Sequence, residues 1–485
     1  MKNLIDIQTF QNSLLNFTTF LTAISGNLLC SPKSDFCFTH VSCDSRNITE
    51  GSLFFPLVGE KQDGHKYIYE AERKGASVIC IEKSFILNHR HEILSYFSDK
   101  NVFVVETENN LRALQKTAAA YVDKFPHLVR IGITGSSGKT TTKELAVSVF
   151  KEKYSVVATV GNFNSETGLP LSVFQITKDH QIGIFEMGMN RFDEIGELAD
   201  VLRPHYGIIT NIGTAHIGIL GSKKNIALEK AKIFKHFSDG HIGFVPETSE
   251  FFEYISTNSL GKIKGFSLCN QNIFSHVCDK GLKGFSFKIG DTQVNFPLFG
   301  RYNLENALSV ASLAKEIGLS DEEIGRGLEK VTPLFGRGEV LTGSFDIIQD
   351  CYNANAESMH SSLDFLQNFS GKGKKYFVIG DMLELGEDSQ KIHKELIDSI
   401  DCSKIAGGIF FGAEMAEAAK KTSFDANILS FSLIKNTDDS AILSCFNFLK
   451  EKLQKGDVVL VKGSRGIHLE RLTEKLMALQ EETAL

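Results

Sequence analysis

The residue types and spacing that most clearly indicate chemistry occur between positions 132 and 142. This segment reads Gly-Ile-Thr-Gly-Ser-Ser-Gly-Lys-Thr-Thr-Thr and joins an apolar run, 128–133, to a helix-like stretch, 143–150. Its glycines allow successive backbone N–H groups to turn inward, and the N-terminus of the following helix adds positive potential. Lys139 supplies a point charge for the distal phosphates. The segment therefore predicts a loop that binds the phosphates of ATP.

The spacing of this loop differs from the common form G-x-x-x-x-G-K-[ST], because Ile133 stands where the first glycine belongs and Gly132 and Gly135 flank it. A glycine- and serine-rich surface loop is the alternative interpretation. The order of strand, glycine turn, Lys-Thr and helix favours the phosphate loop. A hydroxyl from Thr140 or Thr141 is expected on Mg²⁺. The residues predicted to contact ATP here are Gly135, Ser136, Ser137, Gly138, Lys139, Thr140 and Thr141.

Two further polar side chains follow apolar runs in the same region. Glu186 ends the run 181–186, and His216 follows the run 206–211. A carboxylate at a strand end beside a phosphate loop suits Mg²⁺, which prefers oxygen ligands, although solvated carboxylates are also common there. Taken alone, His216 is typical of a loop histidine, and Lys230 is typical of a solvated helix face. The residue pattern by itself leaves these roles open.

The elements that must position these residues alternate along the chain. Apolar strand-like runs alternate with helix-like stretches, which favours parallel sheets covered on both faces. A chain of 485 residues is long enough for about three domains. We predict an α/β fold of three domains: a small α/β N-terminal domain (1–127), a central P-loop parallel-sheet ATPase domain (128–335) and a C-terminal Rossmann-like α/β domain (336–485). Prolines at 126 and 333 mark the boundaries, because the residue before proline resists helix.

The predicted strands and helices can be compared directly with a structure. The strands are predicted at 53–58, 77–81, 102–105, 128–133, 181–186, 206–211, 375–379, 408–412, 428–431 and 457–462. The helices are predicted at 110–124, 143–150, 192–202, 303–317 and 320–331.

Composition and charge exclude several classes of protein. Hydrophobic residues make up 42% of the chain and charged residues 23%, as in soluble globular proteins. The net charge of -7 disfavours nucleic-acid binding. No run approaches the roughly 18 apolar residues of a membrane span, and residues 1–26 lack the cationic start and continuous apolar core of a secretory signal. Nine cysteines without a C-x-x-C pair or a Cys/His cluster at zinc spacing predict reduced thiols.

Three polar loops follow apolar runs in the third region. They are 350–355 (Asp-Cys-Tyr-Asn-Ala-Asn), 380–386 (Gly-Asp-Met-Leu-Glu-Leu-Gly) and 462–466 (Lys-Gly-Ser-Arg-Gly). Ligands of parallel sheets bind at the carboxyl ends of strands. We therefore expect these loops to close over a ligand held by the central domain, which places the active site between domains.

These motifs together resemble the Mur ligase family, the ATP-dependent amide-forming ligases of peptidoglycan synthesis. In that family T-G-x-x-G-K-T-T is the usual phosphate loop, so the unusual spacing at 134–141 supports the resemblance. The runs 186–190 (Glu-Met-Gly-Met-Asn) and 210–216 (Thr-Asn-Ile-Gly-Thr-Ala-His) are similar to family motifs. With the loops 350–355 and 380–386, they are most similar to the member that adds D-alanyl-D-alanine.

The resemblance extends from Asp44 to Gly466 and implies roles for individual residues. Lys139, His216 and Lys230 are implied in catalysis, and Lys230, unlike Lys232, falls on the lysine that the family carbamylates. The implied metal ligands are Thr140, Glu186, His216 and Lys230 as its carbamate. The implied ATP contacts outside the phosphate loop are Asn303, Asn306, Arg337 and Asp350. The residues that resemble the binding segments for the UDP end of the nucleotide precursor are Asp44, Ser45, Arg46, Asp63 and His65.

The sequence departs from the family pattern at two positions. Tyr302 stands where many members have histidine, which puts a base contact at that position in doubt. Ala356 replaces the proline that often follows the Asn-Ala-Asn run. Neither change removes a charge that the implied reaction needs.

The resemblance implies a ligase that joins D-alanyl-D-alanine to UDP-N-acetylmuramoyl-tripeptide through an acyl phosphate, with ATP and Mg²⁺. It implies a cytoplasmic monomer of cell wall biogenesis without nucleic-acid or membrane partners, and the third tripeptide residue is diaminopimelate or lysine. One alternative is a Mur-type or folylpolyglutamate-type ligase for another amino acid. The other is a nucleotide-binding regulator without catalysis, which the presence of Lys139, Glu186, His216 and Lys230 disfavours.

Overall fold

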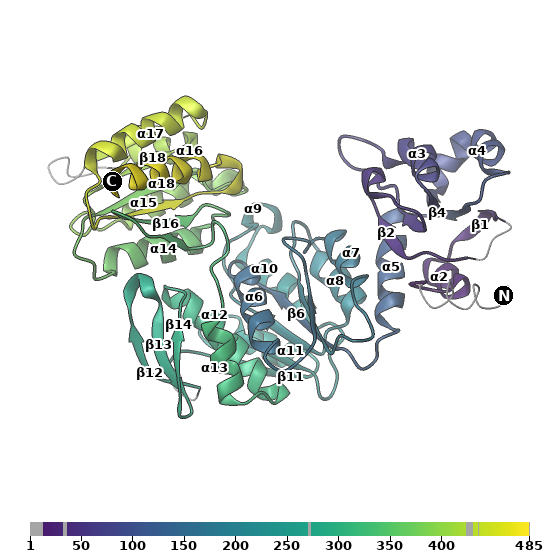
Figure 1. Cartoon of the computed structure of the whole chain (residues 1–485), viewed down its shortest axis with the longest axis horizontal. Helices are drawn as coiled ribbons and strands as arrows, with labels where there is room; N and C mark the ends of the chain where they lie inside the picture. Colours follow the sequence, from purple (N-terminus) through teal and green to yellow (C-terminus); the bar gives the residue numbers. More distant parts are fainter. Residues whose placement is uncertain (1–12, 33–35, 270–272, 423–429, 435, 485) are drawn as a thin grey trace.

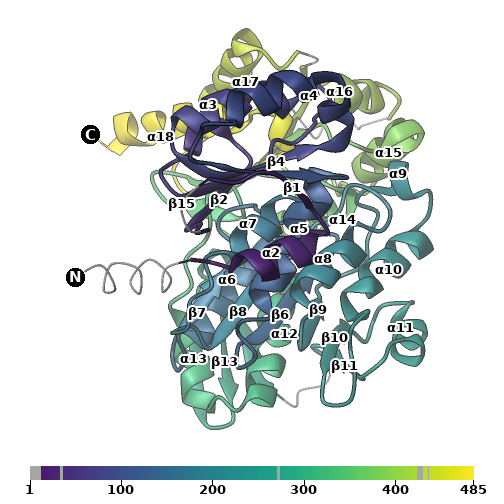
Figure 2. The same cartoon turned by 90° about the vertical axis from the view of Figure 1, so that its right-hand side faces the viewer.

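The chain folds into three α/β domains in series, seen in a computed structural model that describes residues 13–32, 36–269, 273–422, 430–434 and 436–484. In Figure 1 the N-terminal domain lies at the right, the central domain at the bottom and the C-terminal domain at the upper left. Turning the molecule by 90° places the N-terminal sheet in front of the other two domains (Figure 2). Each domain has its own sheet.

The N-terminal domain is a five-stranded sheet in the order β1-β5-β4-β3-β2, antiparallel at β1 and parallel elsewhere. Strand β4 is apolar on both faces, because helices cover it on either side. Its strands are β1 (Asn27–Cys30), β2 (His40–Ser42), β3 (Ser52–Phe54), β4 (Ala76–Glu82) and β5 (Phe103–Thr107). Its helices are α2 (Phe17–Ile24), α3 (Ile68–Arg73), α4 (Lys83–Phe97) and α5 (Asn110–Val122).

The central domain is a six-stranded parallel sheet in the order β11-β10-β9-β6-β8-β7. Alternate residues of its strands enter two buried clusters on opposite faces: Ile184 and Ile208 lie in one, Phe185 and Ile209 in the other. The strands are β6 (Val129–Thr134), β7 (Val156–Ala158), β8 (Ile182–Glu186), β9 (Tyr206–Ile209), β10 (Ile242–Pro246) and β11 (Lys262–Phe266). The helices are α6 (Lys139–Phe150), α7 (Gly168–Val173), α8 (Glu194–Leu202), α9 (Ile217–Leu220), α10 (Lys223–Ala231), α11 (Phe252–Asn258), α12 (Arg301–Ile317) and α13 (Asp321–Glu329).

A three-stranded antiparallel ribbon, absent from the predicted elements, extends the central domain. It consists of β12 (Phe274–Asp279), β13 (Phe285–Ile289) and β14 (Thr292–Phe296). Phe285, Phe287 and Ile289 alternate toward the domain core, and β14 packs against α13. The ribbon therefore closes one face of the same core that supports the phosphate loop.

The C-terminal domain is a six-stranded sheet in the order β15-β16-β20-β17-β18-β19, parallel except at β15. Val458 and Leu460 of β20 face one buried cluster, and Val459 and Val461 face the other. The strands are β15 (Glu339–Leu341), β16 (Asp346–Asp350), β17 (Lys375–Gly380), β18 (Gly407–Phe411), β19 (Ser430–Ile434) and β20 (Val458–Lys462). The helices are α14 (Ala356–Asn368), α15 (Ser389–Asp398), α16 (Ala413–Lys420), α17 (Asp439–Lys452) and α18 (Glu470–Ala484).

Each predicted strand and helix overlaps an element of the structure, with shifted ends; the predicted strand 53–58 continues past the end of β3 at Phe54. The helix after the phosphate loop begins at Lys139, four residues before the predicted start at 143. Part of the predicted strand 428–431 lies outside the described residues, and β19 covers the rest. Helix α5 packs against α2 and also against α7 and α8, so one buried cluster runs from the N-terminal into the central domain. The boundaries after residues 127 and 335 remain predictions.

Among the described residues, no helix combines the length and the apolar composition that a membrane span requires. The nine cysteines all lie in the described ranges, and none of them forms a disulfide bond there; Cys269 and Cys278 are exposed.

Candidate active site

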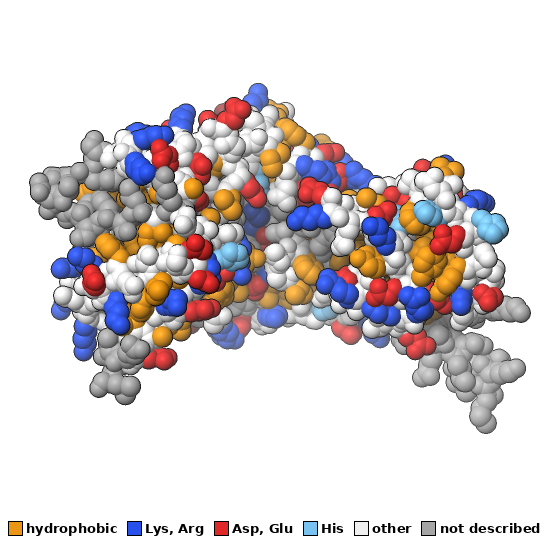
Figure 3. Space-filling model, turned by 90° about the horizontal axis from the view of Figure 1, so that it is seen from above, with side chains coloured by type: hydrophobic (Ala, Val, Ile, Leu, Met, Phe, Trp, Pro, Cys, Tyr) orange, Lys and Arg blue, Asp and Glu red, His pale blue; other side chains and the backbone are white. Residues whose placement is uncertain are grey.

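A cavity of about 500 Å³ lies where the central and C-terminal domains meet. Seen from above, the surface is hollowed between the C-terminal and N-terminal domains, over the central domain (Figure 3). The loop between β6 and α6, the ends of β8 and β9, and the start of α12 form the central-domain wall. Segments 336–337 and 350–362 supply the opposite wall. The cavity thus lies at the location predicted for the active site, between the two domains, and many polar side chains line it.

The phosphate loop is held in shape by the end of strand β9. Thr210 Oγ1 donates to the carbonyl of Ser137 at 2.6 Å, and the Ser137 N–H donates to Asn211 Oδ1 at 2.9 Å. Gly138, at φ 77°, ends the loop in a left-handed conformation, and a Cβ there would lie 2.9 Å from the Asn306 amide. Only glycine fits both the conformation and the space. The backbone N–H groups of the loop are therefore preorganised at the N-terminus of α6.

Lys139 is the first residue of α6 and lies over the loop. Its Nζ donates to the Gly135 carbonyl at 2.9 Å. Burial lowers the pKa of Lys139, and the nearby Glu186 carboxylate opposes that shift. An ammonium tethered to the loop in this way can instead bind a phosphate oxygen without moving far.

Glu186 and His216 face the cavity with unsatisfied atoms. The β6–β8 register pairs Glu186 with Ile133, immediately before the loop, and Asn164 Nδ2 donates to Glu186 Oε1 at 2.6 Å. Within the described structure, Glu186 Oε2 and His216 Nδ1 are buried without a hydrogen-bond partner. Burial first, and then Lys139 and Lys230, lower the pKa of His216 to about 4. The imidazole is therefore neutral at pH 7 and free to act as a ligand.

These groups fit a hard divalent cation that keeps several other ligands. Thr140 lines the same cavity as Glu186 and His216. In the ranges that the structure covers, no three His, Cys, Asp or Glu side chains are placed to hold a metal by themselves. Mg²⁺ is usually bound through one or two carboxylates together with phosphates and waters, so two protein ligands and a hydroxyl are a sufficient set.

Lys230 is fully buried, whereas its sequence context taken alone is typical of a lysine on a solvated helix face. Its side chain is 1% exposed, and the atom nearest to Nζ in a polar contact is Met189 Sδ, at 4.0 Å. The neighbouring Glu229 accepts from the N–H groups of Asp193 and Ile195 and so is occupied elsewhere. Burial lowers the pKa of Lys230 well below its ordinary value. Burial therefore favours the neutral amine over the ammonium at this position.

Lys232, two residues further on, is in the opposite environment. Its Nζ lies 2.6 Å from Glu229 Oε2 and 3.0 Å from Asp193 Oδ1, and its side chain is 35% exposed. Lys232 is an ordinary surface ion-pair partner. The two lysines that the resemblance distinguishes therefore lie in different environments.

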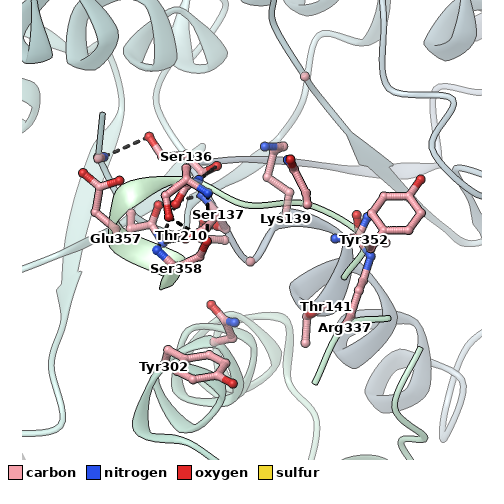
Figure 4. A pocket seen from close by; sticks show the side chains of 18 of the residues that line it. Ser136, Ser137, Lys139, Thr141, Thr210, Tyr302, Arg337, Tyr352, Glu357 and Ser358 are labelled. Atoms are coloured by element: carbon pink, nitrogen blue, oxygen red, sulfur yellow. Dashed lines mark hydrogen bonds between the residues drawn. The ribbon is translucent and has the colours of Figure 1, made fainter. Parts of the chain in front are cut away.

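The predicted ATP contacts from outside the loop also converge on the cavity. Asn303, Asn306, Arg337 and Asp350 all line it. The Arg337 guanidinium stacks on Tyr352 at 4.0 Å, as Figure 4 shows, and Tyr302 lies across the cavity from the phosphate loop. Asp350 Oδ2 accepts from Lys462 Nζ at 2.6 Å and from Ser362 Oγ at 2.9 Å.

Two residues that position this site were not predicted. Asn164 orients Glu186, and Glu357 joins the two domains: Glu357 accepts from the Thr214 N–H at 2.6 Å and from the Thr214 hydroxyl at 3.2 Å. Asn164 lies in the loop between β7 and α7, beyond the end of a strand that was not among those predicted, so the strand-end signal that selected Glu186 did not reach it. Glu357 carries no local signal, because its partner is 143 residues away.

The residues predicted to hold UDP lie on the N-terminal domain, apart from this cavity. Asp44 caps the short helix 45–47 and is bonded to the exposed Arg46 guanidinium, with Arg46 Nη2 2.7 Å from Asp44 Oδ2. Ser45 is buried beside them. His65 is 1% exposed, with Nδ1 2.6 Å from Asp63 and Nε2 accepting from the Glu82 N–H at 3.1 Å. His65 therefore supports the fold of this segment, while Arg46 and Asp44 remain accessible.

Three family models match consecutive parts of the chain. "Mur ligase family, catalytic domain" matches residues 38–121, "Mur ligase middle domain" matches 133–314, and "Mur ligase, glutamate ligase domain" matches 336–465.

Curated relatives align over almost the full length. A UDP-N-acetylmuramoyl-tripeptide--D-alanyl-D-alanine ligase of Treponema pallidum is 40% identical over 95% of this chain and 98% of its own. A ligase of the same name from Bacillus subtilis is 32% identical over 93% of this chain and 95% of its own length.

Solved structures give the same family. MurF from Acinetobacter baumannii superposes with a TM-score of 0.83 at 26% identity, covering 96% of this chain and 98% of that one. MurF ligase from Thermotoga maritima in complex with ADP superposes with a TM-score of 0.76 at 27% identity, covering 92% of this chain and 98% of that one. With family models across three successive segments and a 40% identical relative over nearly the whole length, this chain belongs to the Mur ligase family.

Proposed function

We propose that the chain is an ATP-dependent ligase that joins D-alanyl-D-alanine to UDP-N-acetylmuramoyl-tripeptide, giving the UDP-linked pentapeptide for peptidoglycan synthesis. The main support for an ATP-dependent reaction is that the phosphate loop with Lys139 lines the same interdomain cavity as Glu186 and His216. The names of the full-length relatives support the two substrates. The ADP complex of the Thermotoga maritima protein supports the nucleotide.

The chemistry explains why such a cavity is needed. A carboxylate does not react with an amine at neutral pH, because its leaving group would be oxide. Attack of the tripeptide carboxylate on the ATP γ-phosphate forms a C–O–P linkage and releases ADP. The dipeptide amine then attacks the carbonyl carbon, the C–O bond breaks, phosphate leaves and the amine loses a proton. Lys139 and the loop N–H groups contribute alignment and charge neutralisation to the first step.

Thr140, Glu186 and His216 are the residues proposed to hold Mg²⁺. Their fit rests on the unpartnered Glu186 Oε2, the unpartnered His216 Nδ1 and the neutral imidazole. When bound, Mg²⁺ neutralises phosphate charge that Lys139 alone leaves uncompensated. Gly135 to Thr141, Asn303, Asn306, Arg337 and Asp350 are proposed to hold the rest of ATP.

Lys230 is proposed to be carbamylated. A neutral lysine amine can attack CO₂, forming an N–C bond and losing a proton, whereas an ammonium cannot. Lys230 is buried without a counter-ion, and the product would be an anion suited to a second Mg²⁺. Lys230→Ala should abolish activity, and high concentrations of a short carboxylic acid should partly restore it by supplying the missing oxygen anion. Activity of Lys230→Ala in bicarbonate-free buffer would rule the carbamate out.

The N-terminal domain is proposed to hold the UDP end of the precursor through Asp44, Ser45, Arg46, Asp63 and the segment that His65 supports. The domain limits 1–127, 128–335 and 336–485 are proposed with it. Both substrates of the first step are nucleotides, which supports a cytoplasmic site of action. A monomer is proposed as the working unit.

A substrate panel tests this proposal directly. The purified chain, with ATP and Mg²⁺, is offered UDP-N-acetylmuramoyl-tripeptide with D-alanyl-D-alanine, D-glutamate or meso-diaminopimelate, and products are identified by mass. We expect pentapeptide only with D-alanyl-D-alanine, with one phosphate released per amide formed. A product with another amino acid would identify a sibling ligase, and absence of any product from folded protein would identify a non-catalytic nucleotide-binding protein.

A further inference from the structure

Six acidic side chains line the interdomain cavity, and five of them are already bonded. Asn164 binds Glu186, backbone N–H groups bind Glu194, Arg301 pairs with Glu305, Lys462 binds Asp350, and Thr214 binds Glu357. The sixth is Glu384, on the loop that follows β17. Within the described residues its carboxylate has no hydrogen bond and no cationic partner other than the contact with His216 discussed next.

The carboxylate of Glu384 is directed at the reaction centre. Its Oε2 lies 3.3 Å from His216 Nδ1, a contact that fails the geometry of a hydrogen bond, since His216 Nδ1 has no hydrogen-bond partner. The Glu384 side chain is 64% exposed. It is therefore accessible to a ligand that enters beside His216.

The backbone holds Glu384 in this position. Its φ is 66°, a left-handed conformation that non-glycine residues seldom adopt and that persists only where the surroundings impose it. The same loop packs closely on helix α9 of the central domain: a Cβ at Gly218 would lie 3.1 Å from the Gly386 nitrogen and 3.3 Å from the Glu384 carbonyl. Glu384 is thus fixed beside His216 by the contact between its loop and α9.

We propose that Glu384 binds the α-ammonium of the incoming dipeptide and orients it toward the activated carbonyl. This inference rests on the proposed function, in which the nucleophile is an amine with a pKa near ~8 that arrives mainly as a cation. Among the carboxylates that line the cavity in the described structure, Glu384 is the one that is exposed and has neither a hydrogen bond nor a Lys or Arg partner; Glu305, also exposed, faces Arg301 at 3.7 Å. The assignment is to binding and orientation, and no proton transfer is assigned to Glu384.

A trapping experiment separates this role from the activation of the tripeptide. Hydroxylamine, which is uncharged at neutral pH, intercepts an acyl phosphate and yields a hydroxamate without dipeptide. Glu384→Gln should raise the KM for D-alanyl-D-alanine by about tenfold to a hundredfold, the loss expected for a charge-assisted hydrogen bond. Hydroxamate formation and the KM for ATP should stay within about twofold of the unsubstituted enzyme.

The matched control is Glu387→Gln, which removes an exposed carboxylate three residues away on the same loop. It should leave all of these constants unchanged. An unchanged dipeptide KM in Glu384→Gln would overturn the proposal, as would an equal fall in hydroxamate and pentapeptide formation, because the latter would place Glu384 in the activation step. If the unsubstituted enzyme forms neither product, the proposed function itself fails.

Discussion

Replacing Lys230 with methionine should raise the stability of the protein and lower its activity. Methionine has nearly the shape of lysine without its amine. Because Lys230 is 1% exposed and its Nζ meets only a thioether at 4.0 Å, the substitution removes a buried polar group that has no proper partner. We therefore expect Lys230→Met to stabilise the central domain while it abolishes ligation.

The size of the stabilisation follows from the burial. An unbonded buried amine costs about 1–3 kcal/mol by protein mutational data. A domain of this size gains about 2–4 °C in Tm per kcal/mol, so the rise should be roughly 2–12 °C. The pKa of Lys230 is lowered, so in the unfolded chain the group binds a proton that the folded chain releases. Wild-type stability therefore increases as pH rises toward the unfolded pKa near ~10.4, and the advantage of methionine should shrink in that range.

The assay is differential scanning calorimetry in bicarbonate-free buffer at pH 7 and pH 9.5, with ligation measured on the same samples. Activity of Lys230→Met should fall by about 100-fold or more, the loss typical of a missing transition-state charge. Lys232→Met is the matched control: it breaks the ion pairs with Glu229 and Asp193 and should lower Tm slightly with activity retained. A lower Tm for Lys230→Met would refute the burial argument, and retained ligation would refute a catalytic role for Lys230.

Three further perturbations have defined outcomes. Lys139→Ala removes a charge-assisted contact to phosphate. The affinity for ATP, measured by calorimetry, should fall about tenfold to a hundredfold, and phosphate release should be almost abolished. Near-normal turnover would contradict the phosphate-loop assignment. Glu357→Gln weakens the bond to Thr214 across the domains and should lower kcat/KM about tenfold at unchanged Tm, whereas Glu395→Gln on α15 should not; equal rates in both variants would argue against the interdomain role. Burial and Arg130 lower the pKa of His205 from 6.5 to about 4. As the pH falls, the unfolded chain therefore binds a proton at this histidine before the folded chain does. The free energy of unfolding should fall between pH 6.5 and 4, by up to about 3 kcal/mol. Denaturant unfolding of His205→Phe should show a flatter acid limb, and an unchanged limb would contradict that shift.

Much of the fold could be predicted because its elements carry local signals. The apolar runs that became β6, β8, β17 and β20 are buried on both faces, so their composition identified them. The ribbon β12–β14 was missed, although Phe285, Phe287 and Ile289 alternate as a half-buried strand should. That signal was present in the sequence and was not used.

Other features depend on packing and had no local signal. Lys230 lies in the last turn of α10 and Lys232 follows directly after that helix. Only the contact of Lys230 with Met189 and the ion pairs of Lys232 make the two lysines different. His65, implied as a substrate residue, is buried, and Asp63 and the Glu82 N–H occupy both ring nitrogens; its role in substrate binding stays a prediction. Residue type and spacing thus identified the groups that meet at the cavity, while burial determined what each group can do.

The central claim is that ATP activates the tripeptide carboxylate, and an isotope experiment tests it most directly. UDP-N-acetylmuramoyl-tripeptide labelled with ¹⁸O in both oxygens of its terminal carboxylate is ligated to D-alanyl-D-alanine, and the released phosphate is analysed by mass. Because the carboxylate oxygen that attacks the γ-phosphate leaves with it, each phosphate should carry one ¹⁸O atom. Unlabelled phosphate accompanying pentapeptide formation would contradict the acyl-phosphate account.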